Sequence, residues 1–519
     1  MQFTSLPPEL LTGILLELDF QSLFRCRQVC VLLKDLIDQD VRLQYQIELA
    51  VAGMEDGPPS ATTAAERLRM LNARQDAWDK LAWTEREEIP MSQGGVWELY
   101  GGVLAQGEGS RSLVFKQLPS KIRGIEGRTW RLEDVGVNIR DFGMDPSQDL
   151  LVIIENRPEQ SGMTCSVHLR SLETGEPHRA APRPAVVSHL PQVREYSYAI
   201  QVSESYLGVL MTSHDGDHSE MLIWNWKTGH RHLYLTGADL ASFAFLTSHH
   251  VLLGSLPAVA IGEDNLFHGD DPRLLVIDLE RLSGEHEMDF NDLDYLCEFH
   301  YPALTDNFAV IGLSIRSDPA PNWTPSPGLK VPFHVARQDR LFVITLGVIH
   351  GNMQVIPLIS LVPSSTFLAC LDKIAPGETR RAFEWSEWGP AGSRLMPGLP
   401  THSSVWVCYV YGMTFVMSAR SGSQRVVMTL DFNQLAVRRA RQQGRKRDTY
   451  SAINDDNRLS APSGVFTEEV KTSLPHIIRR SGPLGAEGEG HFDAAMISED
   501  SLVLVASQSH IRKYRILTF

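Results

Sequence analysis

The sequence predicts a multidomain protein, with a small all-α domain and a helical linker followed by an all-β propeller of six or seven blades. Apolar residues recur at three- and four-residue spacing near the N-terminus, which is typical of helices. After Gly94 the spacing changes to alternation, and short apolar runs recur at a period of roughly 40 to 60 residues. We therefore place the helical domain at 1–53, the linker at 54–93 and the propeller at 94–519.

The composition is that of a globular chain with more than one domain. The 519 residues are 43% hydrophobic and 21% charged, with a formal net charge of -15. This negative surplus argues against nucleic acid as a partner, because a phosphate backbone attracts Lys and Arg. The six cysteines are scattered without a CxxC pair, and no apolar run reaches the roughly 18 residues of a membrane helix. We expect reduced thiols, no membrane, and a location in the cytoplasm, the nucleus or both.

Three helical patterns follow one another between Leu6 and Asp38. Pro7 and Pro8 suit the start of the first helix, and Asp19 suits the N-cap of the second. The first stripe comprises Leu10, Leu11, Ile14, Leu15 and Leu18. The second helix contains Leu23, Phe24 and Cys26. The third pattern comprises Val29, Cys30, Leu33, Leu36 and Ile37.

These helices carry more apolar side chains than so small a unit can bury. Leu16 lies outside the first stripe, and Val31 and Leu32 lie on the opposite side of the third. A helix with apolar residues on more than one face needs more than one packing surface. Either these side chains pack on the rest of the chain, or a partner protein covers them, helix against helix.

The segment LPPELLTGILLELDFQSLFRCRQVCVLLKDLID resembles an F-box. The residues that match the family pattern are Leu6, Pro7, Leu10, Ile14, Leu15, Leu18, Leu23, Val29, Cys30 and Leu33. The segment departs from the family after Val29-Cys30, where a basic residue and then an aromatic one often follow, but Val31-Leu32-Leu33 stands here. In that family the motif docks onto the Skp adaptor, which links it to a cullin-based ubiquitin ligase.

The resemblance implies that this segment binds a Skp adaptor and, through it, a cullin. The residues that we expect to bind the adaptor are Leu6, Pro7, Leu10, Leu11, Ile14, Leu15, Leu18, Leu23, Val29, Cys30, Leu33 and Leu36. On this hypothesis Leu15→Asp or Leu33→Asp should abolish adaptor binding and leave the propeller folded.

The linker is predicted to contain an amphipathic helix. A helix over 41–52 should end at Gly53, a residue type that favours helix C-termini. In the next helical pattern, one face carries Leu68, Leu71, Gln75, Trp78 and Leu81. Because the opposite face is charged, this helix should lie on a neighbouring domain. Many F-box proteins use such a stalk to fix the distance between adaptor and substrate module, and the resemblance suggests the same here.

The C-terminal part contains six apolar runs, each followed by a more alternating strand. The runs lie at 149–155, 206–212, 249–255, 307–315, 405–417 and 501–507. Fully apolar runs suit inner strands covered on both faces, and alternating ones suit outer strands. Residues 96–105 could open the first blade and 511–517 could close the ring, which would leave no exposed sheet edge. A pair of β-sandwiches is the alternative, and the likeness to WD-repeat propellers is architectural only because no Trp-Asp repeat occurs.

No motif predicts enzymatic chemistry, a cofactor or a metal. The most metal-like cluster, His214 to Glu220, contains the Asp-Gly pair of a turn, so a solvated hairpin is favoured. His249 and His250 open a strand, where successive side chains point to opposite faces, so we do not expect them to share an ion. The chain also lacks the nucleophile elbow, the P-loop and the dinucleotide-binding fingerprint.

One basic run stands out in the acidic chain. It contains Arg438, Arg439, Arg441, Arg445, Lys446 and Arg447, and a polar, loop-like stretch at 448–464 follows it. The run suits a nuclear localisation signal or a patch for an acidic or phosphorylated partner. Alternatively, it is a solvated helix or loop that extends a blade, which is the interpretation that we favour.

These features together predict a substrate-recognition subunit of a Skp–cullin–F-box ubiquitin ligase. The helices would hold the adaptor, the linker would set the spacing, and the propeller would recruit a protein target. Two alternatives stay open: a scaffold that uses the adaptor and propeller outside a ligase, and a propeller enzyme with a deep central pocket. The sequence does not identify the target, its phosphorylation state, the number of blades, the binding face or the oligomeric state.

Overall fold

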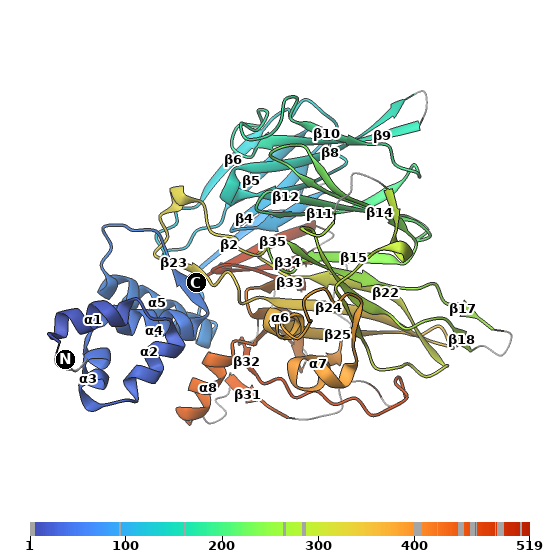
Figure 1. Ribbon diagram of the computed structural model, residues 1–519. Helices are drawn as coiled ribbons and strands as arrows, with labels where there is room; N and C mark the ends of the chain where they lie inside the picture. Colours follow the sequence, from blue (N-terminus) through green and yellow to red (C-terminus); the bar gives the residue numbers. More distant parts are fainter. Residues whose placement is uncertain are drawn as a thin grey trace.

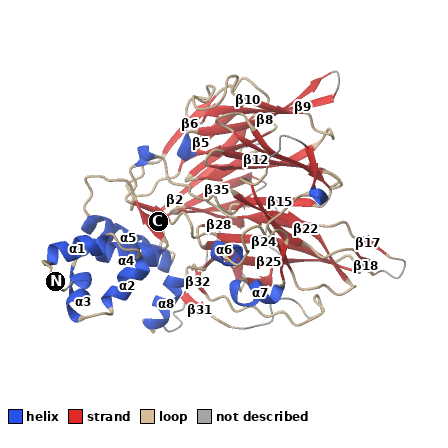
Figure 2. Cartoon of the chain, in the orientation of Figure 1, coloured by secondary structure: helices blue, strands red, loops and turns tan. Residues whose placement is uncertain are grey.

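A cluster of helices lies at one end of the molecule, and a ring of β-sheets forms the rest (Figures 1 and 2). The computed structural model describes residues 6–92, 95–159, 162–262, 266–282, 287–398, 407–422, 424–444, 451–456, 462, 464–482, 484, 492–508 and 511–519. Helices built from these residues are all too short or too polar to cross a membrane.

Four short helices form the N-terminal helical unit: α1 (Pro8–Leu16), α2 (Phe20–Arg27), α3 (Val31–Gln39) and α4 (Val41–Ala52). The Asp19 carboxylate caps α2 by accepting a hydrogen bond from the Ser22 amide at 2.8 Å. Gly53 ends α4 in the left-handed conformation, with φ of 66°. Both predicted caps are therefore confirmed. The third helix begins at Val31 rather than Val29, because Cys30 is extended and serves as its N-cap.

The linker contains a long helix that lies on the propeller, as predicted. This helix is α5 (Ala64–Lys80), and Thr63 and Glu66 form a capping box at its start. The Trp78 ring stacks on the C-terminal Phe519, with ring centroids 4.1 Å apart. Before the helix, β1 (Met54–Asp56) pairs with β23 (Phe333–Val335), which belongs to a long loop of the propeller.

Seven sheets of four or five strands make the ring. The first contains β3 (Trp97–Tyr100), β4 (Val103–Glu108), β5 (Ser112–Gln117) and β6 (Arg128–Leu132). The second contains β7 (Asp141–Asp145), β8 (Leu150–Glu159), β9 (Gly162–Ser171) and β10 (Val186–His189). The third contains β11 (Tyr196–Ser203), β12 (Tyr206–Ser213), β13 (Ser219–Asn225), β14 (Arg231–Gly237) and β20 (Glu287–Asp289). The fourth contains β15 (Leu240–Phe245), β16 (His250–Ser255), β19 (Arg273–Asp278), β21 (Cys297–His300) and β26 (Arg381–Phe383).

The last three sheets complete the ring. The fifth contains β22 (Phe308–Arg316), β24 (Leu341–His350), β25 (Val355–Pro363) and β27 (Arg394–Pro397). The sixth contains β28 (Val410–Tyr411), β29 (Thr414–Ser421), β30 (Gln424–Asp431), β32 (His476–Arg480) and β31 (Ser451–Asn454). The seventh contains β33 (Phe492–Ser498), β34 (Ser501–Gln508), β35 (Ile511–Thr518) and β2 (Glu85–Pro90). The connections between strands also contain α6 (Ser364–Leu371), α7 (Trp385–Gly392), α8 (Gln434–Gln442) and a small ribbon of β17 (Ala260–Ile261) and β18 (Phe267–His268).

The predicted fold class is confirmed, with seven blades, and the sandwich alternative is excluded because the sheets form one ring. The ring closes as expected through residues 511–517, but their outer partner comes from the other end of the chain. β35 pairs antiparallel with β2, from Glu85↔Thr518 to Pro90↔Lys513. Residues 85–90, which lie in the predicted linker segment, therefore belong to the last sheet.

Most of the fully apolar runs are the second strands of their sheets, and these are inner strands covered on both faces, as predicted. In β8, Val152 and Ile154 pack in a cluster with the third sheet, whereas Leu151 and Ile153 pack in a cluster with the first. The second strand is thus covered on both faces by neighbouring blades. Residues of several first strands, among them Glu98 of β3 and Asp141 of β7, instead line the central channel.

Two further predicted elements differ in the structure. The run 405–417 was expected to be one strand, but its described part turns at Gly412, with φ of 56°, between β28 and β29. Residues 405 and 406 lie outside the described residues. The expected loop 448–464 contributes β31, which pairs with β32 at the edge of the sixth sheet.

Candidate functional site

The N-terminal helical unit has a small apolar core of its own. Its buried members are Leu15, Leu23, Leu33, Ile37 and Leu43, each at most 3% exposed. Asp38 ties the helices together from outside: the Arg27 Nε donates to Asp38 Oδ1 at 2.6 Å and Lys34 Nζ to Oδ2 at 2.8 Å. These hydrogen bonds, the one from Arg27 above all, lower the pKa of Asp38 to about 2.

The same unit also exposes large apolar side chains. Besides Val41 (39% exposed) at the start of α4, they are Leu10 (57%), Ile14 (43%), Phe24 (40%), Val29 (70%), Val31 (73%) and Leu32 (41%), and we call the six residues of the first three helical segments the exposed apolar set. Single exposed apolar residues are normal on a protein surface, but these six lie close together in the sequence, between Leu10 and Leu32. The surplus noticed in the sequence is therefore not covered by the propeller.

The twelve residues predicted to bind the adaptor divide into three groups by exposure. Pro7, Leu10, Ile14 and Val29 are exposed. Leu6, Leu18, Cys30 and Leu36 are half-buried. Leu11, Leu15, Leu23 and Leu33 are buried. The buried residues stabilise the unit instead of presenting a surface, so Leu15→Asp or Leu33→Asp would remove adaptor binding by unfolding it.

Sequence reasoning left Phe24, Val31 and Leu32 out of the predicted site, although all three are exposed. A signal for two of them was present in the run from Val29 to Leu33, because five consecutive apolar residues cannot all face one core. For Phe24 the signal is weaker: Phe20 lies one turn earlier, and the two rings stack with centroids 6.0 Å apart.

A buried arginine fastens the linker to the propeller. Arg67, only 5% exposed, donates to the carbonyl oxygens of Pro58 at 2.7 Å and Pro332 at 3.0 Å. The Tyr45 hydroxyl also donates to Pro332 O, at 3.0 Å. The Pro58 carbonyl, the Pro332 carbonyl and the Tyr45 hydroxyl thus meet at one point, where α4, α5 and the β23 loop come together.

Ion pairs make a second set of contacts between helices and blades. Arg74 of α5 contacts Asp500 at 2.6 Å, and Arg479 of β32 contacts Asp79 of α5 at 2.8 Å. Because these side chains are largely buried, they fix the orientation of the helices more firmly than exposed pairs would.

The basic run is partly used for packing. Its described residues lie on α8, where Arg439 Nη2 donates to Glu48 of α4 at 2.9 Å and Arg441 contacts Asp455 at 3.2 Å. Arg438 is exposed. The predicted members Arg445, Lys446 and Arg447 lie outside the described residues. Arg439 therefore packs against the N-terminal unit. This agrees better with a helix that extends a blade than with a patch free to bind an acidic partner.

A channel runs through the ring and contains a cavity of about 310 Å³. Its lining includes Glu98, Asp141, Tyr198, Phe245, Arg316 and Asp318. Burial raises the pKa of Glu98 to about 8, with a further rise from Asp318 and Asp141. Burial likewise raises the pKa of Asp141 and of Asp318 to about 6. The channel is thus acidic but only partly ionised at neutral pH.

We expect Glu98→Gln to remove a pH dependence of stability. In the wild type the folded state keeps a proton on Glu98 between pH 7 and 8 that the unfolded carboxyl, with its ordinary pKa of 4.5, has lost. The free energy of unfolding should therefore fall by about 1 kcal/mol over that interval as pH rises. Urea unfolding at both pH values measures the slope, and Glu133→Gln, an exposed change, is the control. A Glu98→Gln variant with the wild-type slope would contradict the assignment.

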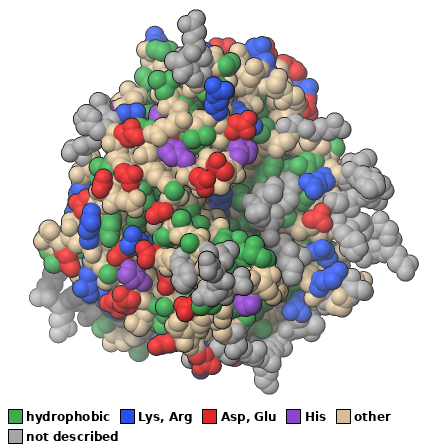
Figure 3. Space-filling model, turned by 90° about the vertical axis from the view of Figure 1, so that its right-hand side faces the viewer, with side chains coloured by type: hydrophobic (Ala, Val, Ile, Leu, Met, Phe, Trp, Pro, Cys, Tyr) green, Lys and Arg blue, Asp and Glu red, His purple; other side chains and the backbone are tan. Residues whose placement is uncertain are grey.

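The face of the ring away from the helices also carries exposed apolar residues. Leu190 (65% exposed) and Val193 (37%) lie between β10 and β11, and Met353 (65%) and Val355 (51%) lie at the β24–β25 turn. In an antiparallel blade, the turn between the second and third strands lies at the same end as the connection to the next blade. Both pairs of residues therefore lie at the end of the ring where β17 and β18 project, between the second and third strands of the fourth sheet. Figure 3 shows this face, hollowed near its centre.

Of the two histidine clusters from the sequence, one forms the predicted structure and the other does not. The 214–220 segment forms a hairpin turn as predicted, and Glu220 is fully buried, accepting from the Gln192 amide at 2.7 Å and the Tyr234 hydroxyl at 3.0 Å. His249 and His250 do not point to opposite faces: their ring centroids are 4.1 Å apart. The reason is that β16 begins at His250, so His249 lies in the preceding turn.

Comparison with known proteins identifies the helical unit. The F-box domain family matches residues 3–45. No curated protein matches the sequence. Among solved structures, Kluyveromyces lactis Hsv2 (complete loop 6CD) is 10% identical with a TM-score of 0.25, covering 51% of this chain and 67% of that chain. The WD40 domain of SCAP from fission yeast is 8% identical with a TM-score of 0.30, covering 80% and 82%. Polysaccharide lyase Uly1 is 9% identical with a TM-score of 0.34, covering 82% and 90%. Because all three TM-scores are below 0.5, we infer neither fold nor function from these similarities.

Proposed function

We propose that this chain, an F-box domain at residues 3–45 followed by a seven-bladed β-propeller, is the substrate-recognition subunit of a Skp–cullin–F-box ubiquitin ligase. The helical unit would bind the Skp adaptor and, through it, the cullin. The propeller would recruit a protein target. The subunit would catalyse no reaction itself, and would act by raising the concentration of target lysines near the ubiquitin-loaded enzyme.

The observation that carries the proposal is the exposed apolar set within the F-box domain. The domain folds around its own core, and yet Leu10, Val29 and Val31 remain more than half exposed. F-box domains generally bind Skp adaptors, and an apolar, helix-lined surface fits such a partner. Burying these side chains would provide the main driving force for association.

The contacts between helices and blades support the second part of the proposal. A ligase subunit that presents a target must hold adaptor and target at a set distance, since a floppy connection would lower the effective concentration. Arg67, Arg74 and Arg479 each bridge the linker region and the propeller with buried or half-buried partners. The exposed residues Leu190, Met353 and Val355 lie on the far side of the ring and could receive a target there.

The test is reconstitution of the full-length chain with a Skp adaptor and a cullin. We expect a stable ternary complex in size-exclusion chromatography, with the cullin retained only when the adaptor is present. Absence of adaptor binding would overturn the proposal. Adaptor binding without the cullin would favour the scaffold alternative, in which the same domains act outside a ligase.

A second candidate function has one observation in its favour, the acidic channel. Glu98, Asp141 and Asp318 line a cavity large enough for a small molecule, as a propeller enzyme or a ligand-binding propeller would require. Turnover of a small molecule by the full-length chain without any adaptor, and its loss in Asp318→Asn, would favour this candidate over the ligase subunit.

A further inference from the structure

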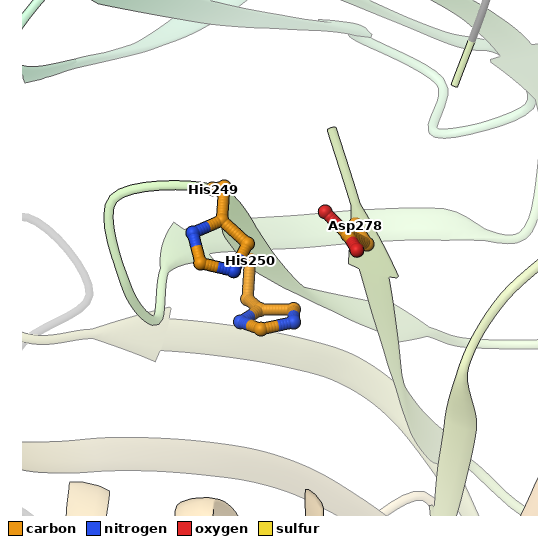
Figure 4. A group of neighbouring side chains, drawn as sticks. All are labelled: His249, His250 and Asp278. Atoms are coloured by element: carbon orange, nitrogen blue, oxygen red, sulfur yellow. The ribbon is translucent and has the colours of Figure 1, made fainter. Parts of the chain in front are cut away.

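A cluster of two histidines and one aspartate lies in the fourth sheet. One nitrogen of His249, one nitrogen of His250 and one carboxylate oxygen of Asp278 all lie within 4.8 Å of one another. No other set of three or more such side chains meets this distance among the residues that the structure describes. Figure 4 shows the two imidazole rings next to each other, with Asp278 on the neighbouring strand.

The backbone holds the three residues in register. His250 and Asp278 are directly paired in the antiparallel ladder between β16 and β19. The Leu279 amide donates to the carbonyl oxygen of His249 at 2.9 Å, which ties the turn before β16 to the end of β19. The three side chains therefore start from fixed positions, and little chain entropy is lost if they bind a common ligand.

Neighbouring hydroxyls orient both rings. The Thr247 Oγ1 lies 2.9 Å from His250 Nδ1, and the Ser248 Oγ lies 3.1 Å from His249 Nδ1. Metal-binding histidines commonly have such a contact at the nitrogen that does not bind the metal, which fixes the orientation of the ring. All three cluster residues are half-buried, so a dissolved ion can reach them.

We propose that His249, His250 and Asp278 form a site for a divalent transition metal, with Zn²⁺ as the reference ion. Two imidazoles and a carboxylate are donors that suit Zn²⁺ better than Mg²⁺ or Ca²⁺, which prefer oxygen ligands. Three protein ligands leave the remaining coordination position to water or to a group from a partner. Ligands of a tetrahedral zinc ion lie about 3.4 Å apart, so the side chains would close slightly on the ion.

One residue competes with the metal. Arg281 Nε lies 3.2 Å from Asp278 Oδ2, so the guanidinium neutralises the carboxylate that the site needs. A bound cation must displace this contact or share the carboxylate with it. Since Arg281 is 53% exposed, its removal should leave the fold intact while freeing the carboxylate.

The experiment is titration of the full-length chain with Zn²⁺ alone, in competition with a chromogenic chelator. We expect the full-length chain to bind one equivalent of Zn²⁺ at this site. His250→Ala and Asp278→Asn should each lower the affinity for that equivalent by at least tenfold, in line with the loss of a metal contact. Arg281→Ala should raise the affinity for Zn²⁺ severalfold, which a misfolded variant could not do. The matched control is the double variant His230→Ala and His232→Ala, which removes another close histidine pair, with ring centroids 4.7 Å apart.

Each outcome of this titration decides the proposal. Zinc binding that is unchanged in His250→Ala and Asp278→Asn would overturn it and would assign the zinc to other groups, such as the cysteines. An Arg281→Ala variant that binds zinc no better than the wild type would overturn the role of Asp278. Co²⁺ in place of Zn²⁺ gives a second readout: nitrogen and oxygen ligands should give weak visible bands without thiolate-to-metal charge transfer. Thermal melting without metal verifies that the variants are folded.

Discussion

Replacing both Ile14 and Val31 with Asp is expected to weaken binding of the Skp adaptor by about 100-fold or more. Both side chains are exposed, at 43% and 73%, so neither contributes to the core of the helical unit. Each Asp would bury an unpaired carboxylate in the interface at a cost of at least about 1–3 kcal/mol, and each change also removes apolar contact area. Calorimetric titration of the full-length double variant with the purified adaptor measures the loss.

The matched control for this experiment is the double variant Met353→Asp and Val355→Asp. These residues are equally exposed but lie on the far side of the ring, so adaptor affinity should stay within about twofold of wild type. Circular dichroism and thermal melting should show that both double variants fold normally. If Ile14→Asp with Val31→Asp binds the adaptor at wild-type strength, the exposed apolar set is not the docking surface.

Replacing Asp500 with Asn is expected to lower the free energy of unfolding by about 3–5 kcal/mol. Asp500, 2% exposed, accepts hydrogen bonds from Arg123, from Arg74 at 2.6 Å and from the Ser120 hydroxyl at 2.7 Å. Removing one partner of a buried ion pair leaves the other charge buried and uncompensated. Urea unfolding at pH 7, followed by tryptophan fluorescence, measures the change.

The loss of stability in Asp500→Asn should depend on pH in a defined direction. The arginines hold the pKa of Asp500 well below its ordinary value of 3.8 in the folded state. The contribution of the carboxylate is therefore complete above about pH 4 and is lost as pH falls further, so the gap between variant and wild type should narrow in acid.

The control for Asp500→Asn is Glu173→Gln, which removes an exposed ion pair with Arg128. Both side chains of that pair are more than half exposed, so the change should cost less than about 1 kcal/mol. If Asp500→Asn also lowered the free energy of unfolding by less than about 1 kcal/mol, the buried cluster around Asp500 would not stabilise the ring. Because Arg74 belongs to α5, loss of the cluster should also loosen the helices from the propeller.

Much of the organisation could be predicted because it depends on short-range rules. The helix caps at Asp19 and Gly53 follow from the chemistry of a few neighbouring residues. The change from helical to alternating periodicity is also local, and it separated the helical region from the blades. The F-box motif was readable because it is short and contiguous, so its residues keep their spacing whatever the rest of the chain does.

The exposure of each leucine could not be predicted in the same way. Leu10 and Leu11 are adjacent and chemically identical, and yet Leu10 is 57% exposed and Leu11 is fully buried. Periodicity predicts that a helix has an apolar face, but the neighbouring helices decide which side chains the core has room for. The predicted adaptor-binding residues therefore mixed core with surface.

The sequence by itself determined the two kinds of domain, the helix ends and the docking motif, since these depend on residues close together in the chain. Only the tertiary structure decided which strands lie in the middle of each blade, that Glu85–Pro90 completes the last sheet, and that Arg74 meets Asp500. It also brought His249, His250 and Asp278 together. These contacts join segments separated by up to hundreds of residues, and their geometry depends on how the whole ring closes, which no local pattern records.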